Sequence, residues 1–173
     1  IGKQLKHSFS KEIHNSLADY EYQLKEIPPD KLKEFITQRD FKAVNVTIPY
    51  KEEVIPYLDF IDVAAKEIGA VNTIVNKDGR LCGYNTDFYG MKMLISHAGI
   101  NLENKKVAIL GTGGTSKTAN AVAKSLLAKE ILTVSRTKKD KCITYEELYE
   151  NHKDTDVIIN TTPLGMFPDN FAR

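Results

Sequence analysis

The fold is decided by the stretch Lys105-Lys106-Val107-Ala108-Ile109-Leu110-Gly111-Thr112-Gly113-Gly114-Thr115-Ser116. It opens with an apolar run of strand length, which predicts a strand buried on both faces, as in a parallel sheet. The run passes directly into a glycine turn, and Ala119, Val122, Ala123 and Leu126 then recur at helical spacing. Strand, glycine turn and helix in this order are typical of dinucleotide-binding folds, because glycines let backbone N–H groups approach a pyrophosphate at the helix N-terminus.

The next strand of this unit, Ile131 to Val134, leads into Ser135-Arg136-Thr137, and three lysines follow before Cys142. An Asp or Glu at this position would bind both ribose hydroxyls and favour NAD. Arginine with nearby lysines instead suits a 2′-phosphate, so the sequence favours NADP. The alternative is a solvated basic turn. A third strand, Asp156 to Asn160, ends in a Pro- and Gly-containing loop where a nicotinamide would lie.

A second candidate site follows the strand predicted from Val44 to Ile48. Apolar residues alternate there with Asn45 and Thr47, and Pro49 ends the strand, so Lys51 stands just past it. Ligands in open α/β sheets gather outside the carboxyl ends of strands, where these polar side chains would converge. The alternative is an edge strand with one solvated face and a surface lysine.

Two further strands predicted in this half also end in polar residues. The first runs from Ile68 to Val75 and contains Asn72, and a hairpin turn at 77–80 leads to a second that ends in Thr86-Asp87. Asp87 could equally cap the helix that follows it. We therefore expect polar side chains from several strand ends to lie together.

Three helices are expected before residue 65. Ser10 is the predicted N-cap of the first, with Ile13 and Leu17 on its buried face. Ser8 lies two residues earlier, so both hydroxyls would face one side, although capping and turn chemistry explain Ser10 equally well. His14 is expected to be structural. A second helix starts at 29–31, and a third is expected from Pro49 through Val54 and Leu58.

Composition narrows the protein class. The chain has 173 residues, 42% of them hydrophobic, and 24 basic side chains balance 23 acidic ones. Neither nucleic acid nor a membrane is an expected partner, since no charge excess and no apolar run of about 20 residues occurs. Cys82 and Cys142 show no metal-ligand spacing, so we expect no metal site and a reducing cytoplasm. No signal peptide opens the chain, although Ile1 suggests trimming.

A polar break at 99–104 predicts a domain boundary. The predicted fold class is α/β, with an N-terminal α/β domain at 1–98 that contains a mixed sheet. A Rossmann-type NADP-binding domain at 99–173 follows and is incomplete, because a crossover needs about a dozen residues and few separate Thr137 from Tyr145.

Taken together, these segments closely resemble the shikimate dehydrogenase family over nearly the whole chain. The matching motifs occur in family order: His7-Ser8-x-Ser10 with His14-Asn15, Asn45-Val46-Thr47-Ile48-Pro49-x-Lys51, Gly69-Ala70-Val71-Asn72-Thr73, Asn85-Thr86-Asp87-x-x-Gly90, Gly111-x-Gly113-Gly114, Ser135-Arg136-Thr137, and Asn160-x-Thr162-Pro163-x-Gly165-Met166. The resemblance implies an enzyme of chorismate biosynthesis that reduces 3-dehydroshikimate to shikimate with NADPH. It also implies that residues 1–98 form the substrate-binding catalytic domain and that the substrate lies in a cleft between the two domains.

The resemblance also implies roles for individual residues. Lys51 and Asp87 are the expected catalytic pair. Substrate ligands would be Ser8, Ser10, Asn45, Thr47, Asn72 and Thr86. Cofactor contacts would come from Gly111, Thr112, Gly113, Gly114, Thr115, Ser135, Arg136, Thr137 and Met166.

The chain departs from the family pattern at Lys11, Ala43, Ser135 and Asp140, and it lacks the family's last stretch, including a substrate-binding glutamine. We therefore expect disordered segments or a fragment, without an intact active site as it stands. Two alternatives remain: a quinate/shikimate dehydrogenase using NAD, and a non-catalytic remnant that binds substrate or nucleotide. Expected associations are a monomer or homodimer, with possible fusion to another pathway enzyme.

Overall fold

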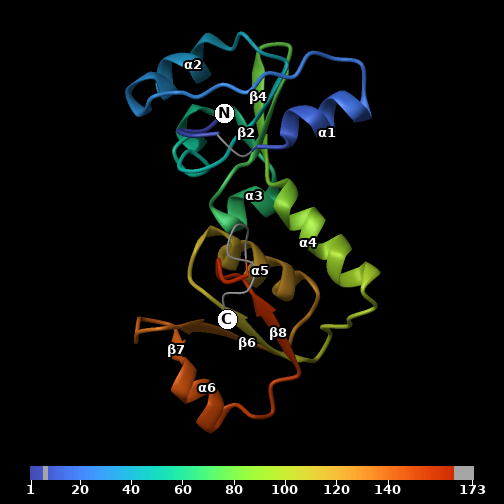
Figure 1. The fold of residues 1–173 in the computed structure, drawn as a ribbon, viewed down its shortest axis with the longest axis vertical. Coiled ribbons are helices and arrows are strands. Elements are labelled where there is room, and N and C mark those ends of the chain that lie inside the picture. The colour runs from blue at the N-terminus through green and yellow to red at the C-terminus, as the bar shows by residue number, and fades with distance from the viewer. Residues whose placement is uncertain (6–7, 166–173) are drawn as a thin grey trace. The chain divides into compact units, whose positions relative to one another are not determined.

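The computed structural model describes residues 1–5 and 8–165, which form an α/β protein (Figure 1). The chain divides into two compact units, Ile1–Thr86 and Asp87–Arg173. This division falls at the start of helix α4 (Thr86–His97), whereas the sequence suggested a boundary at its end. Among the described helices, none is both long and apolar enough to cross a membrane.

The first unit contains a four-stranded mixed sheet in the order β1-β3-β4-β2. Its strands are β1 (Ala43–Asn45), β2 (Phe60–Ile61), β3 (Thr73–Lys77) and β4 (Arg80–Tyr84). β3 pairs antiparallel with β1 and β4, and β2 pairs parallel with β4. The predicted hairpin between β3 and β4 is confirmed. Its two turn residues, Asp78 and Gly79, have φ of 53° and 88°, the positive values that a tight hairpin turn requires.

Strand β1 is shorter than the alternating pattern suggested. It pairs with β3 only from Ala43 to Asn45, after which the N–H of Thr47 donates to the carbonyl of Ile1 at 2.9 Å. Val46 is buried as expected, but Ile48 is 77% exposed, so the apolar face does not reach the end of the stretch. Pairing with distant segments therefore sets the length of this strand.

The helices of the first unit are α1 (Ser10–Leu17), η1 (Pro29–Lys31), α2 (Leu32–Gln38), η2 (Ile55–Tyr57) and α3 (Val63–Ile68). The helix expected after residue 29 is confirmed, with Leu32 and Ile36 buried. The prediction for α1 was wrong in two respects. Phe9, not Ser10, occupies the N-cap position, and Ile13 and Leu17 are 55% and 72% exposed. Amphipathic spacing alone does not supply a surface on which the helix can pack.

The helix expected from Pro49 was also wrong, because turns precede the single 3-10 turn η2. Pro56 lies within η2 and lacks the N–H that a continuing α-helix would use. Tyr50 is fully buried, and its hydroxyl donates to the carbonyl of Ile27 at 2.5 Å. The strand expected from Ile68 begins later, since α3 runs to Ile68 and ends at Gly69, whose φ is 72°.

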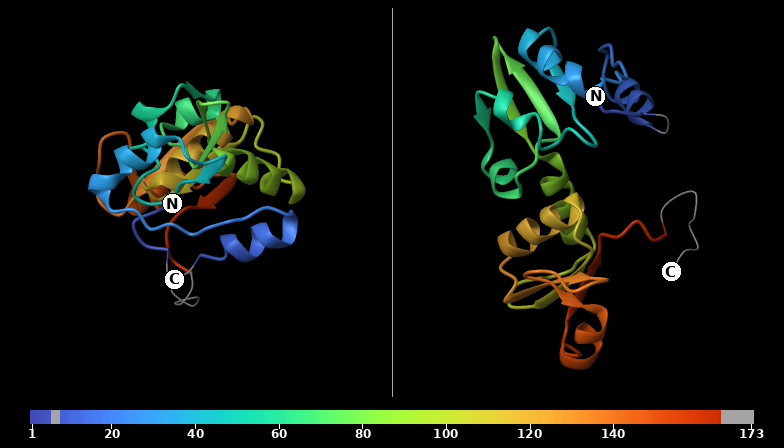
Figure 2. Two further views of the ribbon diagram at one scale, coloured as in Figure 1. Left: turned by 90° about the horizontal axis from the view of Figure 1, so that it is seen from above. Right: turned by 90° about the vertical axis from the view of Figure 1, so that its left-hand side faces the viewer.

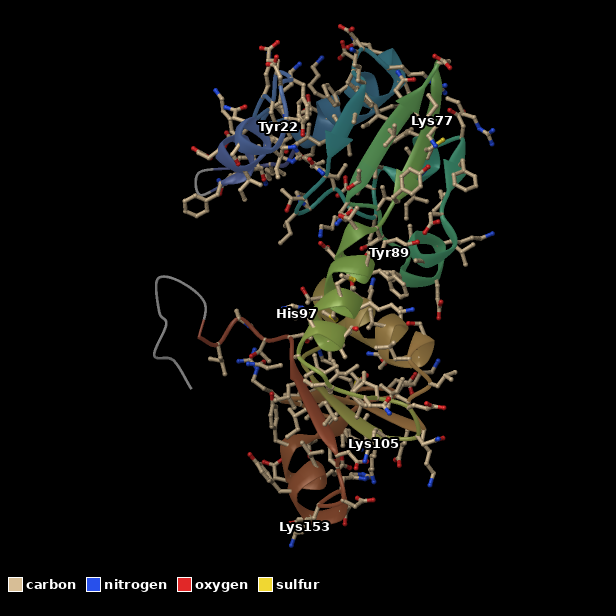
Figure 3. All side chains as sticks on the ribbon, turned by 90° about the vertical axis from the view of Figure 1, so that its right-hand side faces the viewer. Tyr22, Lys77, Tyr89, His97, Lys105 and Lys153 are labelled. Atoms are coloured by element: carbon tan, nitrogen blue, oxygen red, sulfur yellow. The ribbon has the colours of Figure 1, made fainter. Side chains whose placement is uncertain are left out.

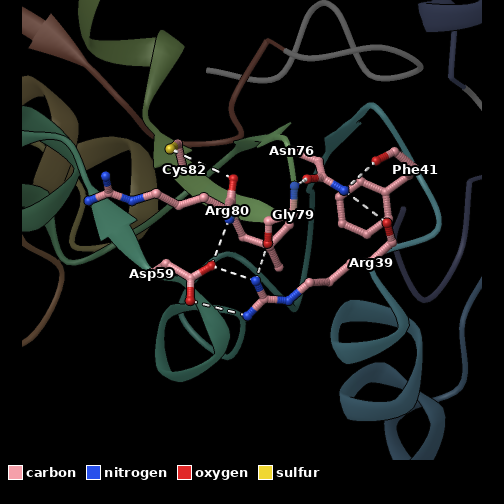
Figure 4. A network of polar contacts seen from close by, with 8 residues as sticks. Arg39, Phe41, Asp59, Asn76, Gly79, Arg80 and Cys82 are labelled. Carbon is pink, nitrogen blue, oxygen red and sulfur yellow. Dashed lines mark hydrogen bonds and ion pairs between the residues drawn. The ribbon is translucent and has the colours of Figure 1, made fainter.

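A polar network fastens the β3–β4 hairpin to the end of α2 (Figure 4). Arg39 forms an ion pair with Asp59 at 2.9 Å and also donates to the carbonyl of Gly79. Asp59 accepts a hydrogen bond from the N–H of Leu81 at 2.7 Å, and Asn76 donates to the carbonyls of Arg39 and Phe41. The Leu81 hydrogen bond, followed by Arg39, lowers the pKa of Asp59 below its ordinary value.

The second unit contains a parallel sheet in the order β7-β6-β5-β8, which confirms the Rossmann-type prediction. Its elements after α4 are β5 (Lys106–Leu110), α5 (Gly114–Ser125), β6 (Glu130–Ser135), β7 (Ile143–Thr144), α6 (Tyr145–Asn151) and β8 (Val157–Asn160). Helices α5 and α6 cover opposite faces of this sheet (Figure 2). Val107 and Ile109 pack with α5, whereas Ala108 packs with Leu148 of α6.

The connection from β6 to β7 is unusually short. Residues 136–142 join these two parallel strands, whereas a crossover usually takes a dozen residues or more. The expectation that no helix fits here holds, but the two-residue strand β7 does form. The basic residues after β6 therefore lie in a short loop beside the end of the sheet.

Candidate active site

A cavity of about 540 Å³ in the first unit brings together four of the predicted substrate ligands. Ser8, Ser10, Asn45 and Thr47 all line it, although the two serines lie more than 30 positions from Asn45 and Thr47 in the sequence. All four side chains are half-buried. Amide and hydroxyl groups that converge on one cavity can bind a small molecule with several oxygen atoms.

The first residues of the chain build one wall of this cavity. Gly2 forms a parallel bridge with Glu26. Ile1 lies beside the end of β1, and its carbonyl accepts a hydrogen bond from the N–H of Thr47. Position 2 has little room for a side chain, because a Cβ there would lie 2.7 Å from the Cγ2 of Thr47 and would force a shift. The start of the chain thus holds Thr47 at the cavity.

A chain of hydrogen bonds runs from the cavity to the start of α4. The Tyr22 hydroxyl donates to Asn45 Oδ1 at 3.0 Å, and Asn45 Nδ2 donates to Thr73 Oγ1 at 3.4 Å. Thr73 donates in turn to Asn72 Oδ1 at 3.1 Å, which also accepts from the N–H and hydroxyl of Thr86 at 2.8 and 3.2 Å. Asn72 is buried, and its side-chain oxygen accepts hydrogen bonds from Thr73 and Thr86.

The two predicted catalytic residues belong to different units. Lys51 lies in the first and is half-buried, and its carbonyl accepts from the N–H of Val71 at 2.7 Å. Asp87 is exposed in the first turn of α4, directly after Thr86, and opens the second unit.

The glycine turn after β5 has the backbone geometry that a phosphate group needs. Gly111 has φ of 110°, a conformation that other residues rarely adopt. Gly113 is the N-cap of α5 and, as a glycine, has no side chain that could cap the helix. A Cβ built on Gly113 or Gly114 would meet no atom within 4 Å, so open space lies beside this helix N-terminus. The positive end of the α5 dipole faces the same space.

The basic loop after β6 reaches this glycine turn. Lys139 Nζ donates to Thr112 Oγ1 at 3.3 Å, while Lys138 forms an ion pair with Glu147 at 2.5 Å. Arg136 and Thr137 are exposed in the loop, and Ser135 is buried at the end of β6. Thr115 is exposed in the first turn of α5. The predicted cofactor contacts at 111–115 and 135–137 therefore lie in one region, whereas Met166 lies outside the described residues.

Sequence reasoning missed three residues of these sites. Tyr22, which is labelled in Figure 3, stands in no motif used for the prediction. It lines the cavity and contacts Asn45. Thr73 was recognised only as part of a motif, and it links two predicted ligands. Thr161 Oγ1 donates to the carbonyl of Leu110 at 2.6 Å and supports the glycine turn. His14, expected to be structural, stacks on Tyr22 with ring centroids 4.0 Å apart.

Comparisons with known proteins agree with this arrangement. Residues 1–74 match the family profile described as the shikimate dehydrogenase substrate binding domain. A shikimate dehydrogenase (NADP(+)) of Clostridium beijerinckii is 43% identical over 185 aligned positions, which cover 97% of this chain and 68% of the relative. Because 185 positions exceed the 173 residues of the chain by 12, this relative carries residues within the aligned region that the chain lacks.

Solved structures of shikimate dehydrogenases also resemble this chain. A chorismate mutase/shikimate 5-dehydrogenase fusion protein from Clostridium acetobutylicum is 38% identical, with a TM-score of 0.88 over 97% of this chain and 66% of its own. A shikimate 5-dehydrogenase from Thermus thermophilus, in complex with NADP(H) and shikimate, is 26% identical, with a TM-score of 0.83 over 99% and 70% of the two chains. The chain therefore belongs to the shikimate dehydrogenase family.

Proposed function

We propose that this protein is an NADP-dependent oxidoreductase that reduces 3-dehydroshikimate to shikimate in the biosynthesis of aromatic amino acids. The observation that carries the proposal is the convergence of Ser8, Ser10, Asn45 and Thr47 on one cavity, in a chain whose relatives are named for this reaction. A cytoplasmic location, action as a monomer or homodimer and association with another pathway enzyme belong to the same proposal. The chorismate mutase fusion supports the last of these.

The chain offers groups suited to each part of the substrate. We assign the carboxylate and ring hydroxyls to Ser8, Ser10, Asn45 and Thr47, with Asn72 and Thr86 completing the site. Asn72 Oδ1 already accepts from Thr86 and Thr73, so its amide N–H groups are what Asn72 offers to a ligand oxygen. This gives Asn72 a donor role and a second task, which is to hold the first residue of α4 in place.

The reacting oxygen needs a proton donor. Reduction of a ketone leaves an alkoxide, and an ammonium group can protonate it as a general acid. We assign that role to Lys51. A carboxylate that accepts a hydrogen bond from a neighbouring substrate hydroxyl would hold the ring in register, and we assign this role to Asp87.

The second unit fits NADP. Gly113 and Gly114 leave open the space in which a pyrophosphate would lie against the N-terminus of α5. Arg136 and Lys139 supply positive charge for a 2′-phosphate, and no acidic residue ends β6. When bound, NADPH supplies the hydride.

The test is shikimate-dependent reduction of NADP, followed by absorbance. We expect turnover by a version of the chain extended at both ends, with NADP in preference to NAD, and loss of that turnover in Lys51→Ala. Lys66→Ala is the matched control, since Lys66 is an exposed lysine of α3 outside the site. Turnover that is unchanged in Lys51→Ala would contradict the assigned role, and a preference for NAD with quinate would replace the proposed reaction.

A further inference from the structure

We infer that Tyr22 is a positioning residue of the substrate site, which fixes the side-chain amide of Asn45 in the one orientation that donates a hydrogen bond to the ligand. The inference rests on the proposed function, since it concerns the cavity assigned to the substrate. Tyr22 and Asn45 both line that cavity.

The direction of the hydrogen-bond chain is set at its far end by a backbone group. The N–H of Thr86 lies 2.8 Å from the Asn72 side chain, and a backbone N–H can only donate. The atom of Asn72 that faces Thr86 must therefore be the oxygen. Because this oxygen accepts, the Thr73 hydroxyl that lies 3.1 Å from it must donate to it.

The Thr73 hydroxyl passes this direction on to Asn45. A hydroxyl carries one hydrogen, and Thr73 uses it on Asn72, so toward Asn45 it can only accept. The atom of Asn45 that lies 3.4 Å from Thr73 must then be the amide nitrogen. The amide oxygen of Asn45 consequently faces Tyr22, whose hydroxyl donates to it at 3.0 Å.

This arrangement leaves Asn45 with a defined hydrogen-bonding capacity. Its amide nitrogen carries two hydrogens, and one is used on Thr73, so a second N–H remains for a ligand oxygen. The contact with Thr73 is long, so Tyr22 provides the shorter of the two restraints on the amide. Tyr22 is itself held by its stacking on His14, with ring planes 15° apart.

Without the Tyr22 hydroxyl, the amide of Asn45 would lose the restraint that selects one orientation. The terminal torsion of asparagine is broad and roughly two-fold, so the oxygen could then face the ligand in place of the N–H. If the amide oxygen of Asn45 faced a ligand oxygen that needs a hydrogen-bond donor, the affinity for the ligand would fall. Tyr22→Phe isolates this effect, since it removes the hydroxyl and keeps the ring that stacks on His14.

The experiment measures shikimate binding to the whole chain by isothermal titration calorimetry. We expect Tyr22→Phe to weaken binding roughly three- to ten-fold, as expected for one hydrogen bond. Tyr20→Phe is the matched control, because its hydroxyl contacts His14 in the same aromatic group and not Asn45. We expect Tyr20→Phe to bind shikimate as tightly as the unaltered chain does. All variants should unfold within a few degrees of the unfolding temperature of the unaltered chain.

A double-mutant cycle separates positioning from a general structural role. If Tyr22 acts through Asn45, then Tyr22→Phe adds no further loss of affinity in an Asn45→Ala background. A further loss of the full three- to ten-fold would overturn the inference, as would equal affinity of Tyr22→Phe and the unaltered chain. Absence of shikimate binding by the unaltered, folded chain would overturn the proposed function together with this inference, so the two failures are distinguishable.

Discussion

The glycine turn after β5 permits a prediction in which two neighbouring glycines respond differently to the same added methyl group. Gly111→Ala places an alanine at φ of 110° and puts its Cβ 2.9 Å from Thr161 Oγ1. Gly113→Ala changes a residue at φ of −82°, where a Cβ meets no atom within 4 Å. The first substitution should therefore affect folding, and the second should affect cofactor binding.

The magnitude for Gly111→Ala comes from two sources. A non-glycine residue in a rarely populated backbone region costs about 1–3 kcal/mol. Displacing the Thr161 hydroxyl costs roughly another 1 kcal/mol, because it breaks the 2.6 Å hydrogen bond to the carbonyl of Leu110. We expect the free energy of unfolding to fall by about 2–4 kcal/mol in total. Gly113→Ala should cost less than about 1 kcal/mol, the usual effect of alanine at an N-cap.

Urea and thermal unfolding, followed by far-UV circular dichroism, measure the first effect, and titration with NADP measures the second. We expect Gly113→Ala to weaken NADP binding at least about ten-fold, since the methyl occupies the space for a phosphate at the helix N-terminus. Thr161→Ala should cost roughly 1 kcal/mol in the unaltered chain and little more in the Gly111→Ala background, because the clash there has already broken the hydrogen bond of the Thr161 hydroxyl. Equal destabilisation by Gly111→Ala and Gly113→Ala would show that the backbone conformation and surroundings of Gly111 do not require glycine.

Three further predictions concern single side chains. Arg136→Ala should raise the KM for NADP roughly ten-fold or more and leave the KM for NAD unchanged, because only NADP loses a charge-assisted contact to its 2′-phosphate. Steady-state kinetics with both cofactors will test this. Tyr50→Phe should lower the free energy of unfolding by about 1–2 kcal/mol, because the buried carbonyl of Ile27 loses its partner, and urea unfolding against the unaltered chain will measure it. The folded-state pKa of Asp59 is lowered, so its carboxylate stabilises the fold above its unfolded-state pKa, and this stabilisation is lost as the pH falls through the folded-state pKa. Asp59→Asn should therefore lower the melting temperature at pH 7 and reduce its dependence on acid pH; an unaltered acid dependence would contradict the assignment.

The second unit could be predicted well from the sequence because its signals are local. An apolar run at 107–110, a glycine turn and a helical repeat determine β5, the phosphate-binding turn and α5 without reference to distant residues. The first unit was predicted less accurately because distant contacts decide it. β1 ends where pairing with Ile1 replaces pairing with β3, and Tyr50 turns into the core where Pro49 and two glutamates suggested a helix.

In the candidate site, too, residues with a local sequence signal could be predicted and residues placed by distant contacts could not. Ser8, Ser10, Asn45 and Thr47 could be predicted because each stands in a recognisable motif, and the structure places them on one cavity. Tyr22 could not be predicted, since a tyrosine in a polar stretch gives no signal of its own. Its partner, Asn45, lies 23 positions away, and only the fold brings the two side chains to 3.0 Å.

In the proposed function, the first unit binds the substrate and the second unit binds NADP. The most direct measurement is amide NMR of the isotopically labelled chain during separate titrations with shikimate and NADP. We predict that shikimate shifts signals near Ser8, Asn45 and Asn72, and that NADP shifts signals at 111–115 and 135–139. Shikimate shifts confined to the second unit, or no shifts near the cavity at saturating shikimate, would contradict the account.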